Sequence, residues 1–587
     1  MSHRTFYVVT GRVVDADAQK PVEGLLVEAY DQDLISKNDL LGGFTTDDDG
    51  SFEISFTQRA AEGGNGEWEW TPEPYLMVYA NEGEDVVGRA PAQDGDADGQ
   101  FEAGTIEVDL EGLEEESRHG MAMHRGMKAG RSCVHQSGRF QRFFPELPPH
   151  TPADELLVRL GEVGGPMSEG EDPSTESSIP AGFTFFGQFI DHDITLDTES
   201  SLDRQADLDA ISNFRTPVLE LDNVYRAGPE ADPYLYEHGP RGGLTGKLHF
   251  GTDENPQDLQ RNKGGRAVIG DPRNDENGVI AQFHLAVIKF HNAVVDYLVG
   301  EEGMEPGEEV FEEAQRLVRW HYQWCIVNDF LPRIVGRDLV DELVASNASF
   351  QLFHPDGPPY IPVEFSVAAY RYGHSQLRLS YRLNEDFEGD LFPDPRDRDA
   401  NVIGMGFEPV PEEKVVDWTY FFDIDDDVTP QPGKQVDEKL PRNLLDLPFV
   451  RDPRTSRSSL AARNLLRGKR FELPSGQDVA KRLGIEDRPS MDELALDEIG
   501  FDEAPLWYYV LKEGELQGQG QDGDGLGPVG GRIVGETLIG LLKADPMSYL
   551  VANPCFTPEA AFTLNGDPES FGVADLVAFG ADQEPPC

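Results

Sequence analysis

The pattern of apolar and polar positions changes near residue 138 of this 587-residue chain. Before that point, short runs partly alternate apolar and polar residues, and turn-forming sequence such as Asp-Asp-Asp-Gly at 47–50 separates them. The runs are residues 6–14, 25–30, 51–56, 75–79 and 105–108. Alternation with a period of two between turn signals predicts short β-strands, so we expect a small β-sandwich over residues 1–112.

From residue 138 onward, apolar residues recur at helical spacing, most clearly in residues 183–193, 279–298, 309–335 and 530–542. Residues 350–450 are rich in proline and acidic residues, and we expect long surface loops there. The glycine-rich run 515–531 lacks phosphate-loop spacing and is interpreted as a connection. The chain is too long for one core. We therefore predict a multidomain protein, with an acidic linker at 113–136 and a large, mainly α-helical domain over 137–587.

The chain is strongly acidic. Aspartate and glutamate number 109 against 49 lysines and arginines, which gives a formal net charge of −60. We therefore expect no nucleic-acid partner and no docking on anionic membranes, because both need a basic surface. Only 13 of the basic residues are lysine, a composition that suits high salt but also fits an ordinary acidic protein.

The apolar runs are predicted to be shorter than a membrane span, and the first residues lack the apolar core of a signal peptide. These features predict no membrane association and a location that is cytoplasmic or reached by non-classical secretion. The four cysteines lie far apart and in no metal-ligand spacing, which argues against a disulfide scaffold. Cys325 lies in an apolar helical run and is predicted to be a buried thiol.

The run 183–193, Phe-Thr-Phe-Phe-Gly-Gln-Phe-Ile-Asp-His-Asp, places reactive side chains on one predicted helix. Gln188 and His192 are four residues apart and share a face, and Asp191 lies beside them. Asp193 points elsewhere. Burying such a polar cluster among aromatic residues costs free energy, which a function would explain. One histidine alone is nevertheless more often a hydrogen-bonded core residue than a ligand.

Three later segments each place two polar residues three positions apart, on one side of a helix. The pairs are Arg273 with Glu276, Arg371 with His374, and Asn464 with Arg467. Each pair alone fits a salt bridge or an ordinary helix end. Together the four segments supply two histidines, several arginines and an asparagine, which is what a bound haem needs on its two faces.

The order of these motifs, with Gly-Arg-Phe at 138–140 and Phe-Pro-Glu-Leu-Pro-Pro at 144–149, resembles the animal-type haem peroxidase superfamily. The resemblance covers residues 137–587 and extends to microbial members as well as to the family of myeloperoxidase and peroxinectin. The first domain, with Gly-Arg-Val-Val-Asp at 11–15, resembles transthyretin-like or carboxypeptidase-regulatory-like sandwiches. Such a sandwich would be a place for a protein partner.

The resemblance implies a haem-dependent peroxidase, active against oxidative stress. It would reduce hydrogen peroxide through an oxoferryl intermediate and oxidise a halide, thiocyanate or phenolic donor. His192 would be the distal histidine, Gln188 the amide beside it and Arg273 the distal catalytic arginine. Asp191 and Glu276 match carboxylates that form esters with haem b in mammalian members, although here both could simply make hydrogen bonds or ion pairs.

On the other face of the haem, the resemblance makes His374 the ligand of the haem iron. Asn464 matches the asparagine that accepts the N–H of this imidazole. Arg371 and Arg467 match arginines around the haem propionates. A hydrogen bond of this kind fixes the tautomer of an iron-bound histidine and tunes its basicity.

The resemblance also implies a calcium site. Its ligands would be Asp193, Thr216, the carbonyl of Val218, Glu220 and Asp222. Hard oxygen ligands suit Ca²⁺. The loop departs from the family pattern, with glutamate where aspartate is usual and aspartate where serine is usual. A solvated acidic loop is the alternative.

Two other functions compete with the peroxidase hypothesis. Fatty-acid dioxygenases of the superfamily place a radical-forming tyrosine three residues before the proximal histidine. Here that position is Arg371, between Tyr370 and Tyr372, which favours a peroxidase. The second alternative is an adhesion or binding protein with a vestigial peroxidase domain, which the intact set of His192, Arg273 and His374 argues against.

Overall fold

The computed structural model describes the backbone of the strands between residues 6 and 108, and residues 138–581 apart from internal gaps. The gaps are residues 170–175, 197–201, 203–205, 207–210, 241, 253–254, 346–347, 349, 355–358, 394–400, 405, 448–457 and 498. The chain divides into two compact units, Met1–Met123 and His124–Cys587. The division falls within the segment expected to be a linker.

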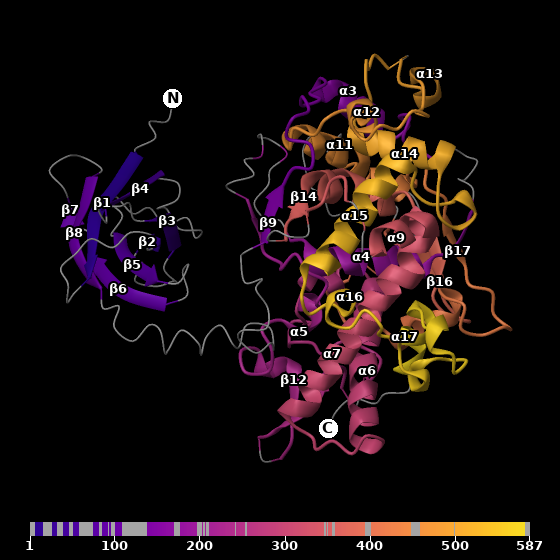
Figure 1. Ribbon diagram of the computed structural model, residues 1–587, viewed down its shortest axis with the longest axis horizontal. Coiled ribbons are helices and arrows are strands. Elements are labelled where there is room, and N and C mark those ends of the chain that lie inside the picture. Colours follow the sequence, from indigo (N-terminus) through magenta and orange to yellow (C-terminus); the bar gives the residue numbers. More distant parts are fainter. Residues whose placement is uncertain are drawn as a thin grey trace. The chain divides into compact units, whose positions relative to one another are not determined.

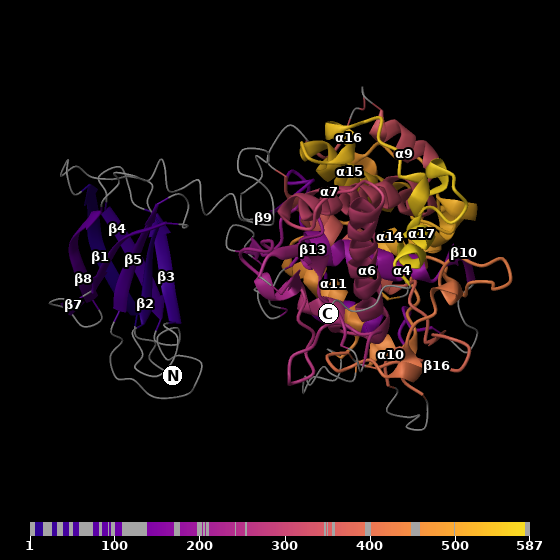
Figure 2. The same ribbon diagram turned by 90° about the horizontal axis from the view of Figure 1, so that it is seen from below.

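The first unit consists of strands, drawn in indigo in Figures 1 and 2. They are β1 Phe6–Asp15, β2 Leu26–Asp31, β3 Asp39–Thr45, β4 Ser51–Thr57, β5 Pro74–Ala80, β6 Asp85–Pro91, β7 Gln93–Asp94 and β8 Gln100–Val108. One four-stranded sheet has the order β4-β1-β8-β7 and the other has the order β3-β2-β5-β6. Strand β1 runs antiparallel to β4 and parallel to β8.

Each run predicted to be a strand in this unit is a strand in the structure. Alternation did not reveal β3, β6 or β7. Strand β3 contains two adjacent glycines and β6 contains one, and a glycine has no side chain to contribute to an alternating pattern. Nearly all side chains of this unit lie outside the described residues, so the β-sandwich and its family resemblance stay predictions.

The second unit is mainly α-helical. Its α-helices are α3 Asp154–Gly161, α4 Gly182–Ile194, α5 Asp222–Tyr225, α6 Gly278–Gly300, α7 Glu308–Cys325, α8 Leu331–Val335, α9 Arg337–Val344, α10 Arg442–Leu445, α11 Leu460–Arg470, α12 Gly476–Arg482, α13 Met491–Leu494, α14 Leu506–Gln517, α15 Pro528–Ala544, α16 Tyr549–Ala552 and α17 Val573–Phe579. Helices α6 and α7 run side by side through this unit (Figures 1 and 2).

Shorter elements connect these helices. The 3₁₀ helices are η4 Pro233–Leu235, η5 Pro272–Asp275, η8 Ala369–His374, η9 Glu412–Lys414, η10 Trp418–Tyr420, η12 Gln521–Gly523, η13 Ala560–Phe562 and η14 Pro568–Ser570. Two π-helical turns are η6 Ile326–Phe330 and η7 Glu364–Ala368. The strands are β9 Gly138–Gln141, β10 Glu176–Pro180, β11 Ser212–Asn213, β12 Tyr236–His238, β13 Leu244–Leu248, β14 Ile361–Pro362, β15 Ser380–Arg382, β16 Glu388–Asp390 and β17 Pro432–Lys434.

The predicted helices are present, but two boundaries differ in an informative way. The run 309–335 is not one helix, because α7 passes into the π turn η6 and then into α8. Pro332, near the start of α8, has no N–H to continue the α-helical hydrogen bonds. The glycine-rich connection is shorter than predicted, since α14 extends to Gln517 and α15 begins at Pro528.

Part of the segment expected to be surface loop is instead buried. Strand β14 pairs with β9, and this small sheet brings residues 143–144 close to the π turn η7. The buried Glu364 of η7 accepts the backbone N–H groups of Phe143 and Phe144 at 2.9 and 3.2 Å. These bonds anchor the turn that leads directly into η8, which ends at His374.

Helix α4 is held by its aromatic face. Phe186 packs against Phe283 of α6, Tyr322 of α7 and Phe330 of η6, with ring centroids 5.6–6.0 Å apart. All of these rings are buried. Because this face is fixed, the opposite face of α4, which carries His192, is fixed as well.

Helix α6 differs from the expectation about apolar runs and membrane spans. Among the described residues it is the one helix long and apolar enough to cross a membrane, so the prediction that no run approaches that length is wrong. However, 94% of its most apolar window is buried inside the protein. Packing therefore accounts for its composition. Cys325 is fully buried, as predicted.

Candidate active site

Four elements of the helical unit, α4, η5, η8 and α11, line one cavity of about 700 Å³. The lining includes every residue predicted to face a haem: Gln188, Asp191, His192, Arg273, Glu276, Arg371, His374, Asn464 and Arg467. Apolar side chains such as Phe140, Leu377 and Phe392 complete it. Segments that are far apart in the sequence are thus brought to one place.

His192 lies on the face of α4 that meets this cavity, one turn from Gln188. Only 5% of its surface is exposed. Burial, reinforced by the charge of Arg273, lowers the pKa of His192 to about 3. The imidazole is therefore neutral at physiological pH, as a proton acceptor must be. Its Nδ1 lies 2.7 Å from Oδ1 of Asn274.

Arg273 is held by the buried Asp271, which caps η5. The Asp271 carboxylate accepts the Arg273 backbone N–H at 2.8 Å and two guanidinium bonds at 3.1 and 2.8 Å. Its other partner is Arg215, at 2.6 and 2.9 Å. Burial alone would raise the pKa of Asp271, but these two arginines hold it well below its ordinary value. Arg273 thus has a fixed, charged anchor.

Two carboxylates share the α4 side of the cavity. Glu276 accepts a hydrogen bond of 2.5 Å from Nε2 of Gln188, and burial raises the pKa of Glu276 to about 7. Burial also raises the pKa of Asp191, against the opposing charges of Arg273 and Arg371. Protein surrounds both groups, yet 35% of the Asp191 side chain and 39% of the Glu276 side chain are open to the cavity.

On the opposite side, Nδ1 of His374 lies 2.8 Å from Nδ2 of Asn464. The Asn464 oxygen accepts a bond of 3.0 Å from Arg371. A guanidinium can only donate, so Arg371 takes the amide oxygen and leaves the amide nitrogen facing the ring. This arrangement differs from the expected one, in which Asn464 accepts the imidazole N–H. Burial, followed by the charge of Arg371, lowers the pKa of His374 to about 3.

The two tyrosines beside Arg371 also line the cavity. The hydroxyl of Tyr370 donates to the backbone oxygen of Gly187 at 3.1 Å, and its ring stacks on Phe365 with centroids 4.5 Å apart. Burial raises the pKa of both Tyr370 and Tyr372 well above the ordinary value. Tyr370 is therefore a neutral phenol engaged with the backbone of α4.

Of the residues of the expected calcium site, Asp193 lies in α4, and none of the five lines the cavity. Asp193 accepts the Leu221 N–H at 3.1 Å, and Asp222 pairs with Arg215 at 3.3 Å. Nowhere in the described part of the chain do three His, Cys, Asp or Glu side chains converge as a metal centre. Yet Asp193 Oδ1 and Thr216 Oγ1 are buried without a hydrogen-bond partner. Burial raises the pKa of Asp193 well above its ordinary value. These two oxygens fit a cation.

Sequence reasoning missed several residues that shape the site. Asp271, Arg215 and Asn274 contact predicted site residues, and His284 of α6 contacts Asn274 at 2.9 Å. Asp271 could have been noticed because it stands two positions before Arg273. Arg215 contacts Asp271 across 56 residues of sequence and Asn274 contacts His192 across 82, and no spacing rule detects such contacts.

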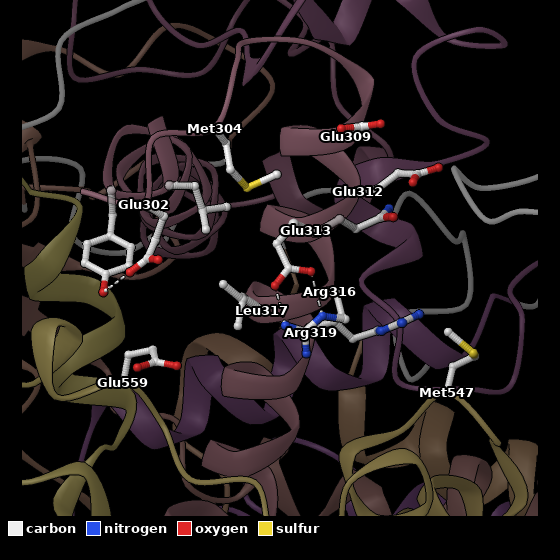
Figure 3. A pocket seen from close by; sticks show the side chains of 13 residues that line it. Glu302, Met304, Glu309, Glu312, Glu313, Arg316, Leu317, Arg319, Met547 and Glu559 are labelled. Carbon is white, nitrogen blue, oxygen red and sulfur yellow. Dashed lines mark hydrogen bonds and ion pairs between the residues drawn. The ribbon is translucent and has the colours of Figure 1, made fainter. Parts of the chain in front are cut away.

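A second cavity, of about 670 Å³, lies between the end of α6, the start of α7 and the residues Met547 and Glu559 (Figure 3). Its lining is acidic, with Glu302, Glu309, Glu312, Glu313 and Glu559. Glu313 is paired with Arg316. None of the described residues that line it is a histidine, and none is a predicted site residue. The chemistry expected from the sequence therefore belongs to the first cavity.

Part of the helical unit is similar in sequence to known proteins. Residues 241–503 match the family model described as animal haem peroxidase. A chorion peroxidase of Aedes aegypti is 24% identical over 345 residues, which cover 54% of this chain and 39% of that protein. Thyroid peroxidase of Mus musculus is 24% identical over 191 residues, 30% of this chain and 21% of that protein. The chain thus spans less than half the length of these relatives.

Solved structures share the fold. Peroxidase A of Dictyostelium discoideum superposes with a TM-score of 0.51 at 14% identity, over 76% of this chain and 95% of that one. A fatty acid α-dioxygenase of Arabidopsis thaliana gives 0.50 at 14% identity, over 73% and 76%. At such identities the likeness concerns the fold alone. The family match over residues 241–503 is to animal haem peroxidases, and both curated relatives are named as peroxidases.

Proposed function

We propose that the protein is a haem-dependent peroxidase that reduces hydrogen peroxide and oxidises a small-molecule donor. One observation carries the proposal. A single cavity holds a neutral histidine beside a fixed arginine on one side, His192 and Arg273, and a second neutral histidine, His374, on the other. This is the arrangement that peroxide chemistry at a haem requires.

The residues that line the cavity fit a haem. Asn464 contacts Nδ1 of His374, and with its amide turned to offer the oxygen it would leave Nε2 of His374 for iron. Arg371 and Arg467 are cations of the lining and would hold the two propionates. Apolar lining residues would contact the porphyrin. When bound, the haem supplies the two electrons that break the O–O bond.

The side chains opposite His374 would transfer the proton of peroxide and stabilise the negative charge that develops on the departing oxygen. Neutral His192 can take a proton from peroxide and return it to the departing oxygen, which leaves as water. Arg273, held by Asp271, presents a positive charge to the oxygen on which negative charge develops. Neither group has to be reorganised before the reaction, because buried partners already hold both.

Covalent attachment of the haem belongs to the same proposal. Asp191 and Glu276 line the cavity and are open to it, so both are accessible to a porphyrin methyl group. A denaturing gel stained for haem tests this directly. Haem that stays with the denatured wild-type chain but leaves the double variant Asp191→Asn with Glu276→Gln supports the esters. Haem that leaves the wild-type chain refutes them.

We also propose that the loop 216–222 and Asp193 bind Ca²⁺. The support is the pair of buried oxygens without a hydrogen-bond partner, Asp193 Oδ1 and Thr216 Oγ1. The expected role of the ion is structural, since Asp193 follows His192 directly in α4. Metal analysis of the purified protein, with the Asp193→Asn variant as control, tests this assignment.

The fatty-acid dioxygenase hypothesis has less support. The position three residues before His374 is Arg371, and the hydroxyl of the nearby Tyr370 bonds to the Gly187 backbone. An assay of the haem-loaded protein separates the two functions. We expect peroxide-dependent oxidation of bromide, thiocyanate or a phenol. Oxygen uptake with palmitic acid, in the absence of those donors, would favour the dioxygenase.

A further inference from the structure

We propose that Asn274 is a positioning residue, which holds His192 in the tautomer that presents an unprotonated Nε2 to the cavity. His284 holds Asn274 in turn. The inference rests on the peroxidase function proposed above, but it concerns two residues to which no role has so far been given.

The three side chains form one buried row. Oδ1 of Asn274 lies 2.7 Å from Nδ1 of His192, and Nδ2 of Asn274 lies 2.9 Å from Nδ1 of His284. Asn274 has no exposed surface, and His192 and His284 are 5% and 1% exposed. Water cannot substitute for either bond at such burial, so each nitrogen depends on the amide between them.

The chemistry of an amide fixes where the protons lie. A carbonyl oxygen only accepts, so Nδ1 of His192 must carry the proton, and the lone pair of this neutral ring is then on Nε2. The amide nitrogen only donates, so Nδ1 of His284 must be the unprotonated nitrogen. Reversing the Asn274 amide would reverse both tautomers, and His192 would then present an N–H that cannot take a proton from peroxide.

The backbone around Asn274 is fixed as well. Its N–H donates to the backbone oxygen of Asp271 at 3.0 Å, and the next residue, Asp275, pairs with Arg261 at 2.9 Å. Phe407 donates its backbone N–H to the Asp275 oxygen at 2.7 Å. A Cβ at Gly406 would lie 2.0 Å from that same oxygen, which shows how closely the backbone at Gly406 packs on η5. The side chain of Asn274 therefore starts from a backbone that these contacts hold in place.

Packing between aromatic rings orients His284, the last residue of the row. His284 lies on α6 and meets Phe189 of α4 edge to face, with ring centroids 5.9 Å apart. The same Phe189 packs on Phe283 at 5.3 Å. His284 is thus held by the same aromatic contacts that hold α4, and its Nδ1 is a fixed acceptor for the Asn274 amide.

Three variants of the haem-loaded protein test this inference by stopped-flow measurement of the reaction with peroxide. Asn274→Leu removes the acceptor, and we expect the second-order rate constant to fall by about 10- to 100-fold, within the contribution of a positioned proton-transfer group. Asn274→Asp keeps an acceptor for Nδ1–H and should restore most of the rate. His284→Phe keeps a ring but frees the amide to turn, so its rate should lie between those two.

A purely structural role would give a different result. Asn292 of α6 is the matched control, because it is equally buried and bonds to the backbone of Leu248 at both ends of its amide. Asn292→Leu should lower stability as Asn274→Leu does, yet leave the peroxide rate unchanged. In all variants, haem content and the rate of phenol oxidation after the peroxide step should stay near the wild-type values.

Nitrogen NMR of the haem-free protein with ¹⁵N-labelled histidine gives a second readout, independent of activity. The His192 signals are assigned by their loss in His192→Gln. We expect a protonated Nδ1 and an unprotonated Nε2 in the wild type, and a mixture of tautomers in Asn274→Leu. A wild type with protonated Nε2, or an Asn274→Leu variant that reacts with peroxide at the wild-type rate, would overturn the inference. A wild type that binds haem but ignores peroxide would instead contradict the proposed function, and the NMR result would still decide the tautomer.

Discussion

The two sides of the cavity hold their histidines with opposite ends of an asparagine. On the α4 side, Asn274 turns its oxygen to His192. On the η8 side, Asn464 turns its nitrogen to His374. The second partner of each amide explains the difference, since His284 accepts from Asn274 whereas Arg371 donates to Asn464.

The two sides of the cavity are prepared for the reaction to different degrees. His192 already presents the nitrogen that a proton acceptor needs. His374 accepts at Nδ1, so its own proton is on Nε2, the nitrogen that iron would use. For iron to bind there, Asn464 must offer its oxygen instead, and Arg371 must release that oxygen. The α4 side is therefore set before the cofactor arrives, and the η8 side is completed by it.

Of all the variants, we expect the strongest effect from one on the η8 side. His374→Ala removes the proposed iron ligand, so the protein should lose haem on gel filtration. His192→Ala, on the other side of the same cavity, should keep it. Haem absorbance per protein measures both. Equal haem content in the two variants would mean that His374 is not the ligand.

The next effect is on the α4 side. His192→Ala should lower the rate constant with peroxide by roughly 100- to 10,000-fold, because the proton acceptor is lost. Arg273→Leu should also slow this step, because charge on the departing oxygen is no longer stabilised. Stopped-flow absorbance of the haem-loaded variants measures the step. A wild-type rate in either variant would place the reaction elsewhere.

A smaller effect separates the two asparagines. Asn464→Leu removes the hydrogen-bond partner of the proposed iron ligand, and we expect haem affinity to fall by about 10- to 100-fold. Asn274→Leu should leave haem affinity unchanged and slow only the peroxide step. Titration of the haem-free variants with haemin measures affinity. If both variants lost affinity alike, the two sides would not differ as described.

The smallest effect concerns the proposed calcium ion. Removal of metal by a chelator should slow the peroxide step modestly and leave haem in place, because Asp193 adjoins His192 on α4 but not His374. The Asp193→Asn variant should be slow from the start and insensitive to the chelator. Full peroxide reactivity of metal-free wild-type protein would contradict the calcium assignment.

Much of the site could be predicted because it depends on local spacing. Gln188 and His192 share a helix face by periodicity alone, and the same holds for Asn464 and Arg467 in α11. The sequence could also indicate that these segments belong together, since a haem needs groups on two faces. In the structure all of them line one cavity.

The remainder depends on contacts that no local pattern records. The orientation of the Asn464 amide follows from Arg371, 93 residues away, and the partner of His192 is 82 residues away. The run 309–335 looked like one helix because amphipathic spacing survives a π turn, whereas the hydrogen bonds do not. Strand β3 was missed because glycine gives no alternating signal.

Above all, we propose that this cavity binds haem and activates peroxide. The optical spectrum of haem-loaded wild-type protein, recorded before and after one equivalent of hydrogen peroxide, tests it most directly. We expect the haem absorption band to change within milliseconds to seconds and to return when a phenol or bromide is added. A protein that binds haem through His374 and shows no spectral response to peroxide would contradict the account.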